Sequence, residues 1–225
     1  MREIVLDTET TGLDPLNGDR IVEIGCVELI NHLPTGRTFQ RYLDPERPMN
    51  PEAAAVSGLT DEFLRGKPKF AEEVDAFLEF VADAAIVAHN AAFDLGFVNA
   101  ELKRLGRPQF SADRSIDTVA IARRKFPGAQ ASLDALCRRF NIDLSARVKH
   151  GALLDAQLLA RVYLELIGGR EPGLGLVAET AARPTLAPEA GRSARPARAH
   201  APTPDEAAAH QAFVAKIKNA IWTRA

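Results

Sequence analysis

Three short segments of this chain set acidic side chains among apolar residues, and this pattern constrains the fold more than any other feature. The segments span residues 4–13, 89–94 and 150–155. Their four acids are Asp7, Glu9, Asp94 and Asp155, and the third segment adds His150. A carboxylate among apolar side chains is costly unless it is paired or bound to a metal ion. Four such carboxylates can balance two divalent cations, so we expect a fold that brings the three segments together.

The first segment is predicted to lie at the end of a buried strand. Residues 4–6 form a short apolar run, which is typical of such a strand. Because side chains alternate across a strand, Asp7 and Glu9 should point to the same side at its end. Gly12 then ends the strand.

The second segment follows another apolar run, at residues 85–88, and leads into a helix predicted over residues 93–105. Asp94 falls in the first turn of this helix. An aspartate in that position often does no more than complement the helix dipole. Ligands gather at the carboxyl ends of strands in open α/β sheets, however, so Asp94 is also well placed to join the first two acids.

The third segment opens a helix predicted over residues 152–166. Asp155 lies on the apolar stripe of this helix, where an unpaired carboxylate is unfavourable. His150 precedes the helix, and Gly151 lets it be oriented independently. Such a histidine is usually an ordinary loop residue. The three segments taken together, in this order, favour a nuclease site in which metal ions activate water against a phosphodiester.

These segments resemble the three motifs of the DnaQ-like superfamily of 3′-5′ exonucleases, in the DEDDh variant with four acids and one histidine. Asp7-Thr-Glu-Thr-Thr-Gly is similar to the first motif, His89-Asn-Ala-Ala-Phe-Asp to the second and His150-Gly-Ala-Leu-Leu-Asp to the third. Within the superfamily the chain looks most like the proofreading epsilon subunits of bacterial DNA polymerase III, strongly over residues 1–170. One departure is Ser57, where many relatives have a histidine that could touch the terminal nucleotide.

The resemblance implies a role for each motif residue. The four acids would bind two divalent cations, Mg²⁺ or Mn²⁺. His150 would be the catalytic base that accepts a proton from the attacking water, a role that suits its reference pKa of about 6.5. Thr10 and Leu13 would contact the terminal nucleotide. Phe93 would either stack on a splayed base or pack in the core.

The predicted elements make one α/β catalytic domain over residues 1–170. Strands are expected at residues 4–6, 21–28, 38–43, 85–88 and 114–117. Helices are expected to begin near residues 51, 70, 93, 119, 132 and 152. The loop between the first two strands is short, so these strands should be antiparallel. We expect an RNase H-like mixed sheet flanked by helices, as the resemblance also implies.

Residues 171–203 are expected to be a flexible linker, because the stretch from residue 181 is rich in Ala, Pro and Arg and cannot bury a core. At its start, residues 171–176 resemble the clamp-binding peptide of bacterial replication proteins, although Glu171 stands where Gln is usual. Weak binding to the sliding clamp is therefore one interpretation, and a simple helix-exit loop is the other.

Residues 204–225 are predicted to form a C-terminal helix, opened by a capping box of Thr203 and Glu206. An isolated helix of this length is marginal in water, so its apolar residues need a partner. The resemblance implies that Phe213, Ile217 and Trp222 bind the catalytic (alpha) subunit of the polymerase. The alternative is that the helix folds back on its own domain.

Charge and cysteine content limit the remaining functions. The net charge of −2 argues against strong nonspecific binding to duplex DNA, which a tethered nuclease would not need. Residues 101–150 carry 11 Lys and Arg against 5 acids; this stretch, which includes Arg147, would either line a path for phosphates or form ordinary solvated faces. Cys26 and Cys137 are isolated, and no membrane span or signal peptide is evident, so a cytoplasmic location without a membrane partner is expected.

Two other functions compete with proofreading. An RNA-trimming DEDDh exonuclease would carry the same motifs, because nothing in them reads a 2′-hydroxyl. A non-catalytic scaffold on this fold would have no need of clustered acids. The polymerase-like tail favours a 3′-5′ exodeoxyribonuclease that acts on single-stranded or frayed 3′ DNA ends.

Overall fold

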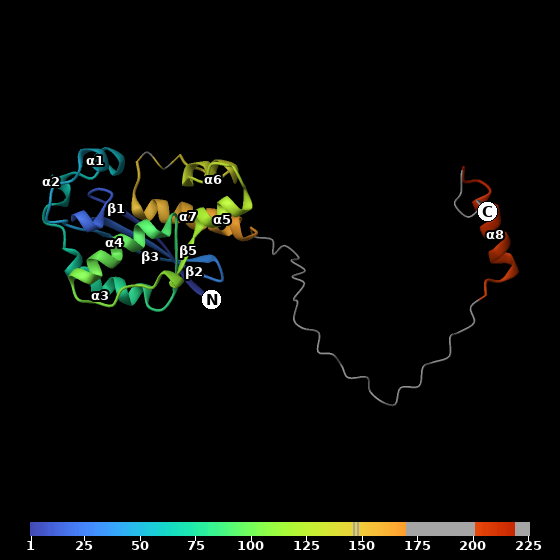
Figure 1. Cartoon of the computed structure of the whole chain (residues 1–225), viewed down its shortest axis with the longest axis horizontal. Helices are drawn as coiled ribbons and strands as arrows, with labels where there is room; N and C mark the ends of the chain where they lie inside the picture. Colours follow the sequence, from blue (N-terminus) through green and yellow to red (C-terminus); the bar gives the residue numbers. More distant parts are fainter. Residues whose placement is uncertain (146, 148, 170–200, 219–225) are drawn as a thin grey trace, which may run out of the picture. The chain divides into compact units, whose positions relative to one another are not determined.

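Strand β1 (Arg2–Thr10) is the centre of the sheet in this computed structural model. Over the described residues, which are 1–145, 147, 149–169 and 201–218, the sheet has five strands in the order β3-β2-β1-β4-β5. Strands β2 (Ile21–Ile30) and β3 (Leu33–Tyr42) are antiparallel, whereas β4 (Ala85–Ala88) and β5 (Ser115–Asp117) run parallel to β1. The mixed sheet predicted from the sequence is therefore confirmed (Figure 1).

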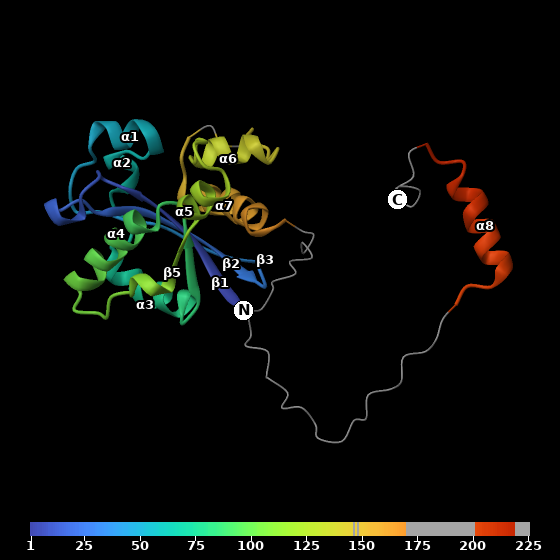
Figure 2. The same cartoon turned by 45° about the vertical axis from the view of Figure 1, so that its right-hand side comes forward.

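The alternation of side chains along β1 produces two cores, one on each face of the sheet. Ile4 and Leu6 pack against α3 (Phe70–Val81) and α4 (Ala91–Arg104). Val5 faces the other way and joins the core formed with three further helices, α5 (Thr118–Lys125), α6 (Leu133–Arg139) and α7 (Ala152–Ile167). The two groups of helices flank the sheet in both views (Figures 1 and 2). Each strand near the site therefore presents alternate residues to different helices.

Short helices complete the upper edge of the domain in Figure 1. Helix α1 (Pro51–Ser57) begins as expected, with Pro51 at its first position and the Asn50 side chain accepting from the Glu52 N–H. Helix α2 (Asp61–Leu64) was not expected, because its four residues are too few to show a helical period. Two 3₁₀ turns, η1 (Pro15–Asn17) and η2 (Ala112–Arg114), lie in the connections.

Two strands are longer than the sequence predicts. Strand β1 extends from Arg2 to Thr10, well beyond the apolar run at residues 4–6, and includes both acids of the first motif. Strand β3 begins at Leu33 rather than at Thr38, and its first six residues are exposed. These residues carry no apolar alternation, so their strand conformation depends on pairing with β2 rather than on burial.

The N-terminus of α7 packs directly on β2 at Gly25. A Cβ atom added to Gly25 would lie 2.2 Å from the backbone carbonyl carbon of Ala152, so only glycine permits this approach. Close by, Glu23 is buried, and its Oε2 accepts a hydrogen bond from the Ala152 N–H at 3.1 Å. Helix α7 thus starts at a fixed point on the sheet, and it ends at Ile167 with Gly168 as its C-cap, one residue beyond the predicted end.

The chain divides into two units, Met1–Gly175 and Leu176–Ala225. In the second unit, α8 (Pro204–Val214) opens with the predicted capping box of Thr203 and Glu206. The helix ends at Val214, earlier than expected, so Ile217 lies beyond it. Phe213 is 64% exposed and Ile217 39% exposed. The predicted linker up to residue 200, the 171–176 peptide and Trp222 lie outside the described residues.

The described residues contain no helix that is long and apolar enough to cross a membrane. Cys26 and Cys137 are both buried, and neither forms a disulfide.

Candidate active site

Asp7 and Glu9 project from a part of β1 that has only one neighbouring strand. Strand β4 pairs with β1 from Glu3 to Val5, and beyond that point β1 pairs with β2 alone. Asp7 and Glu9 alternate with Thr8 and lie on the same face as Val5, the face that α7 covers. The missing neighbour leaves an opening at the carboxyl end of β4, and the two carboxylates border it.

Asp94 reaches the same opening from the first turn of α4. Strand β4 ends at Ala88, and Asn90 then adopts a left-handed conformation (φ 67°) that lets the chain enter α4. The Asn90 N–H donates to Asp117 Oδ1 at 3.0 Å, which fixes this turn to the end of β5. The Asp94 side chain accepts a hydrogen bond from the Thr8 hydroxyl at 2.8 Å. Thr8 therefore ties the acid of the second motif to the strand of the first.

Asp155 and His150 enter from the N-terminus of α7. Asp155 is 3% exposed and lies in the first turn of the helix that Gly25 and Glu23 anchor. The His150 N–H donates to the Val56 carbonyl of α1 at 3.4 Å, so the loop before α7 is attached to α1. The His150 side chain is 47% exposed.

The structure brings all five predicted catalytic and metal-binding residues into one cavity of about 380 Å³. Among the described residues, Glu9, His150 and Asp155 have potential ligand atoms that all lie within 4.8 Å of one another. Asp7 and Asp94 border the same cavity. Because the chain segments come from β1, α4 and α7, this cluster is a product of the fold and not of local sequence.

Burial raises the pKa values of three of these acids, and neighbouring carboxylates add to the rise. Burial, and to a smaller extent the charges of Asp94 and Asp155, raises the pKa of Asp7 well above its usual value. Burial, and to a smaller extent the charge of Asp155, raises the pKa of Glu9 to about 8. Burial raises the pKa of Asp94 to about 7, although the Thr8 hydrogen bond opposes this. Crowded acids of this kind call for positive charge, and carboxylate oxygens are the ligands that Mg²⁺ and Mn²⁺ prefer.

Arg147 supplies one positive charge at this cluster. Its guanidinium donates to both oxygens of Asp155, from Nε to Oδ1 and from Nη2 to Oδ2, each at 2.6 Å. The sequence placed Arg147 with residues that either line a phosphate path or face solvent. Its side chain is only 9% exposed and points into the acid cluster, so it does not form a solvated face.

The three residues predicted to contact the substrate all line the cavity. Leu13 is 82% exposed, so its side chain is accessible to a ligand in the cavity. Thr10 is buried and its hydroxyl donates to the Gly12 carbonyl at 2.6 Å, so it shapes the turn after β1. Phe93 packs on Phe97 at a centroid distance of 5.0 Å while also bordering the cavity, which agrees with both roles considered for it.

Several cavity and support residues were not identified from the sequence. Val56 and Asn50 of the α1 region form part of the wall. The neighbouring Ser57 does not line the cavity, and its hydroxyl donates to the carbonyl of Ala53, which does. Glu23 could have been noticed, because it is an acid inside the apolar run of β2. Val56 carries no such signal.

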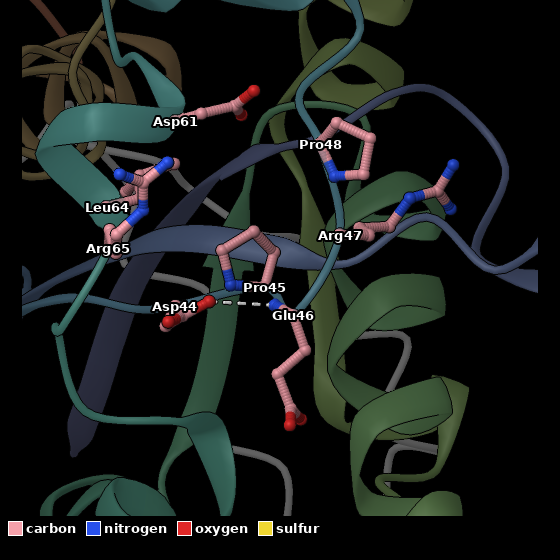
Figure 3. A pocket seen from close by; sticks show the side chains of 8 residues that line it. All are labelled: Asp44, Pro45, Glu46, Arg47, Pro48, Asp61, Leu64 and Arg65. Atoms are coloured by element: carbon pink, nitrogen blue, oxygen red, sulfur yellow. Dashed lines mark hydrogen bonds between the residues drawn. The ribbon is translucent and has the colours of Figure 1, made fainter.

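A second cavity, of about 300 Å³, lies between α2 and the loop after β3 (Figure 3). Several of its charged side chains pair with neighbours. Arg47, for example, lies 3.1 Å from Asp19, and Glu46 pairs with Lys69. None of the five predicted catalytic and metal-binding residues lines this cavity.

Comparison with known proteins agrees with this architecture. Residues 4–163 match the family model described as Exonuclease. A solved structure of the nuclease domain of 3′hExo, a DEDDh family member bound to rAMP, aligns with a TM-score of 0.64 at 19% identity over 74% of this chain and 91% of that one. Exonuclease X in complex with 5′-overhanging duplex DNA aligns with a TM-score of 0.59 at 26% identity over 73% of this chain and 90% of that one. The fold is therefore the RNase H-like exonuclease fold, and the site defines a 3′-5′ exonuclease.

Similarity to characterised sequences extends through most of the chain. The DNA polymerase III subunit epsilon of Rickettsia conorii is 46% identical over 222 residues, which cover 96% of both chains. The protein of the same name from Escherichia coli is 50% identical over 176 residues, covering 75% of this chain and 72% of that protein. The chain belongs to the exonuclease family, and within it to the DNA polymerase III epsilon subunits.

Proposed function

We propose that this chain proofreads DNA synthesis by removing mismatched nucleotides from the 3′ end of a growing strand. The observation that carries the proposal is the cavity in which four carboxylates and His150 meet. Its mouth is flanked by the exposed side chain of Leu13, which is suited to a single unpaired nucleotide. A mismatch lowers the free energy needed to unpair that nucleotide, so mismatched ends would enter more often.

Asp7, Glu9, Asp94 and Asp155 would hold two divalent cations, Mg²⁺ or Mn²⁺. When bound, such ions activate water and stabilise the charge that develops on the attacking and leaving oxygens of a phosphodiester. The elevated pKa values of the acids support this role, because a neighbouring cation would restore their ionised form. Glu23 and Gly25 would contribute indirectly, because they fix the start of α7 and so the position of Asp155.

His150 would act as the general base. Its ring is half-exposed on the loop before α7, where it can accept a proton from the attacking water and pass it to solvent. Its Nδ1 lies 3.5 Å from Asp155 Oδ2, so the acid can orient the ring and stabilise its protonated form. Leu13 and Phe93 would position the terminal nucleotide against these groups.

A digestion assay tests the activity and its substrate class together. The full chain, with Mg²⁺, would be given matched DNA and RNA oligonucleotides, and paired and mismatched primer ends. We expect DNA to be shortened from its 3′ end and mismatched primers to be shortened faster. Asp94→Asn should abolish most activity. Asp75→Asn on the exposed face of α3 should not, because Asp75 does not border the cavity. Faster digestion of RNA would instead favour the RNA-trimming alternative.

Residues 1–170 would form the catalytic domain, 171–203 a linker, and 204–225 a region that binds the polymerase catalytic subunit. The relatives' name as subunits of DNA polymerase III supports this proposal, as does the exposure of Phe213 in α8. Attachment to a replicative polymerase would also place the chain in the cytoplasm. A contact of residues 171–176 with the sliding clamp is part of the same proposal.

The tail proposal is tested by titrating full-length variants into the polymerase catalytic subunit and measuring heat. Phe213→Ala should weaken binding substantially, because large apolar side chains tend to dominate interfaces. Gln211→Ala is the matched control, since this residue is exposed on the same helix and is polar. If Phe213→Ala binds as tightly as the unaltered chain, this side chain is not an anchor.

A further inference from the structure

Arg147 contacts three side chains, and the proposed reaction depends on two of them, Asp155 and His150. Besides its two bonds to Asp155, its Nη2 lies 3.0 Å from His150 Nδ1. Its Nη1 donates to Asp134 Oδ1 at 2.6 Å. Asp155 and Asp134 differ in their surroundings: the side chain of Asp155 is 4% exposed, whereas that of Asp134 is 40% exposed. One guanidinium therefore bridges the interior of the site and its rim.

This arrangement is in conflict with metal binding at Asp155. Both carboxylate oxygens of Asp155 already accept a charge-assisted hydrogen bond from Arg147. An incoming divalent cation would need one of these oxygens and would also repel the guanidinium. Asp134 lies outside the group of four acids and offers Arg147 a carboxylate to which it can remain bound.

We propose that Arg147 is a built-in counter-cation, which holds Asp155 until a metal ion arrives and then releases it while staying anchored to Asp134. The inference rests on the proposed metal site. In the absence of metal ions, Arg147 would stabilise an otherwise repulsive cluster of acids. Metal binding would then free both Asp155 and His150 for the reaction.

The test is calorimetric titration of Mn²⁺ into the metal-free, full-length chain at one fixed pH. Arg147→Gln should bind Mn²⁺ more tightly, on the order of tenfold, because the ion no longer has to break charged hydrogen bonds. Asp134→Asn should bind Mn²⁺ more weakly, because the displaced guanidinium has lost its second acceptor. Arg138→Gln is the matched control: Arg138 lies 3.9 Å from Asp134 and is exposed. It should leave the affinity unchanged.

A second readout is the temperature of unfolding with and without saturating Mn²⁺. The rise caused by Mn²⁺ should be larger in Arg147→Gln than in the unaltered chain. If Arg147→Gln does not fold, Arg147→Lys replaces it; lysine keeps the charge but cannot form the two-pronged pair, so it too should tighten Mn²⁺ binding.

Opposite or equal results would overturn the inference. If Arg147→Gln binds Mn²⁺ more weakly than the unaltered chain, Arg147 instead supports Asp155 in its metal-bound orientation. If the unaltered chain binds Mn²⁺ but Arg147→Gln shows no gain, only the role of Arg147 fails. If the unaltered chain binds no Mn²⁺, or binds it equally well as Asp7→Asn, the proposed metal site fails and the inference falls with it.

Discussion

Replacing Gly25 with alanine should damage the site through the position of α7. The added Cβ would lie 2.2 Å from the Ala152 carbonyl carbon and 2.2 Å from the Leu153 nitrogen, whereas ordinary contact begins near 3.4 Å. Both atoms are backbone, so neither can rotate away. The N-terminus of α7 must therefore retreat by on the order of 1 Å, and it carries Asp155 with it.

Two magnitudes follow from that displacement. Overpacking of this kind typically lowers the free energy of unfolding by about 1–3 kcal/mol. A displacement of about 1 Å in a catalytic group can reduce the rate by about 10²-fold. Activity should therefore fall much further than stability, because most of the fold does not depend on this contact. Weakening of the Glu23 hydrogen bond to Ala152 would add to both effects.

The assay compares Gly25→Ala with Gly96→Ala in α4. A Cβ atom added to Gly96 would have no neighbour within 4 Å, so this control should be neutral or stabilise the helix by up to about 1 kcal/mol. Urea unfolding gives the free energy of unfolding of each variant, and digestion of a single-stranded oligonucleotide at saturating Mg²⁺ gives its turnover. Full activity in Gly25→Ala would refute the argument that this close approach sets the position of Asp155.

Two further predictions concern single side chains of the cavity. His150→Ala should lower turnover on the order of 10²–10⁴-fold while Mn²⁺ affinity, measured by calorimetry, largely survives. If the variant instead loses Mn²⁺ affinity and keeps its turnover at saturating metal, His150 is a metal ligand together with Glu9 and Asp155. Leu13→Ala should leave the unfolding temperature unchanged, because the side chain is 82% exposed, but raise the KM for single-stranded DNA; an unchanged KM would exclude a substrate contact.

The sequence was sufficient for the elements whose pattern is local. Buried strands such as β4 and the apolar stripe of α7 follow from periodicity, and the capping residues Asn50 and Thr203 mark helix starts. The gathering of the acids could be expected only because strand ends and first helical turns meet at one edge of an α/β sheet. Resemblance to a known family then supplied the roles.

The sequence was insufficient where a residue's environment is set by distant segments. Arg147 appeared as one of many basic residues, and its pairing with Asp155 depends on the path of the loop before α7, which has no periodicity to predict it. Similarly, the exposed start of β3 has no apolar pattern of its own and exists because β2 offers hydrogen bonds. Helix α8 ends at Val214 although the apolar spacing continues to Ile217. Periodicity describes what a helix could bury and does not fix where it ends.

The last prediction concerns the pH dependence of stability when divalent cations are removed. Burial raises the pKa of Asp94 from 3.8 to about 7 and that of Glu9 from 4.5 to about 8. At a pH between the unfolded and the folded pKa of each group, the folded chain binds a proton that the unfolded chain has already released. The contribution of these two groups to the free energy of unfolding is therefore fully present below about pH 4. It is lost as the pH rises through 7 and 8.

Each such proton changes the free energy of unfolding by about 1.4 kcal/mol per pH unit, although the neighbouring acids share the effect. Thermal unfolding in the presence of a chelator should therefore show a falling midpoint between pH 5 and pH 8, and saturating Mg²⁺ should remove most of the fall. Asp94→Asn cannot ionise and should flatten the profile, whereas Asp75→Asn, exposed on α3, should not. An equally steep profile in Asp94→Asn would show that the crowding of these acids does not limit the stability of the metal-free chain.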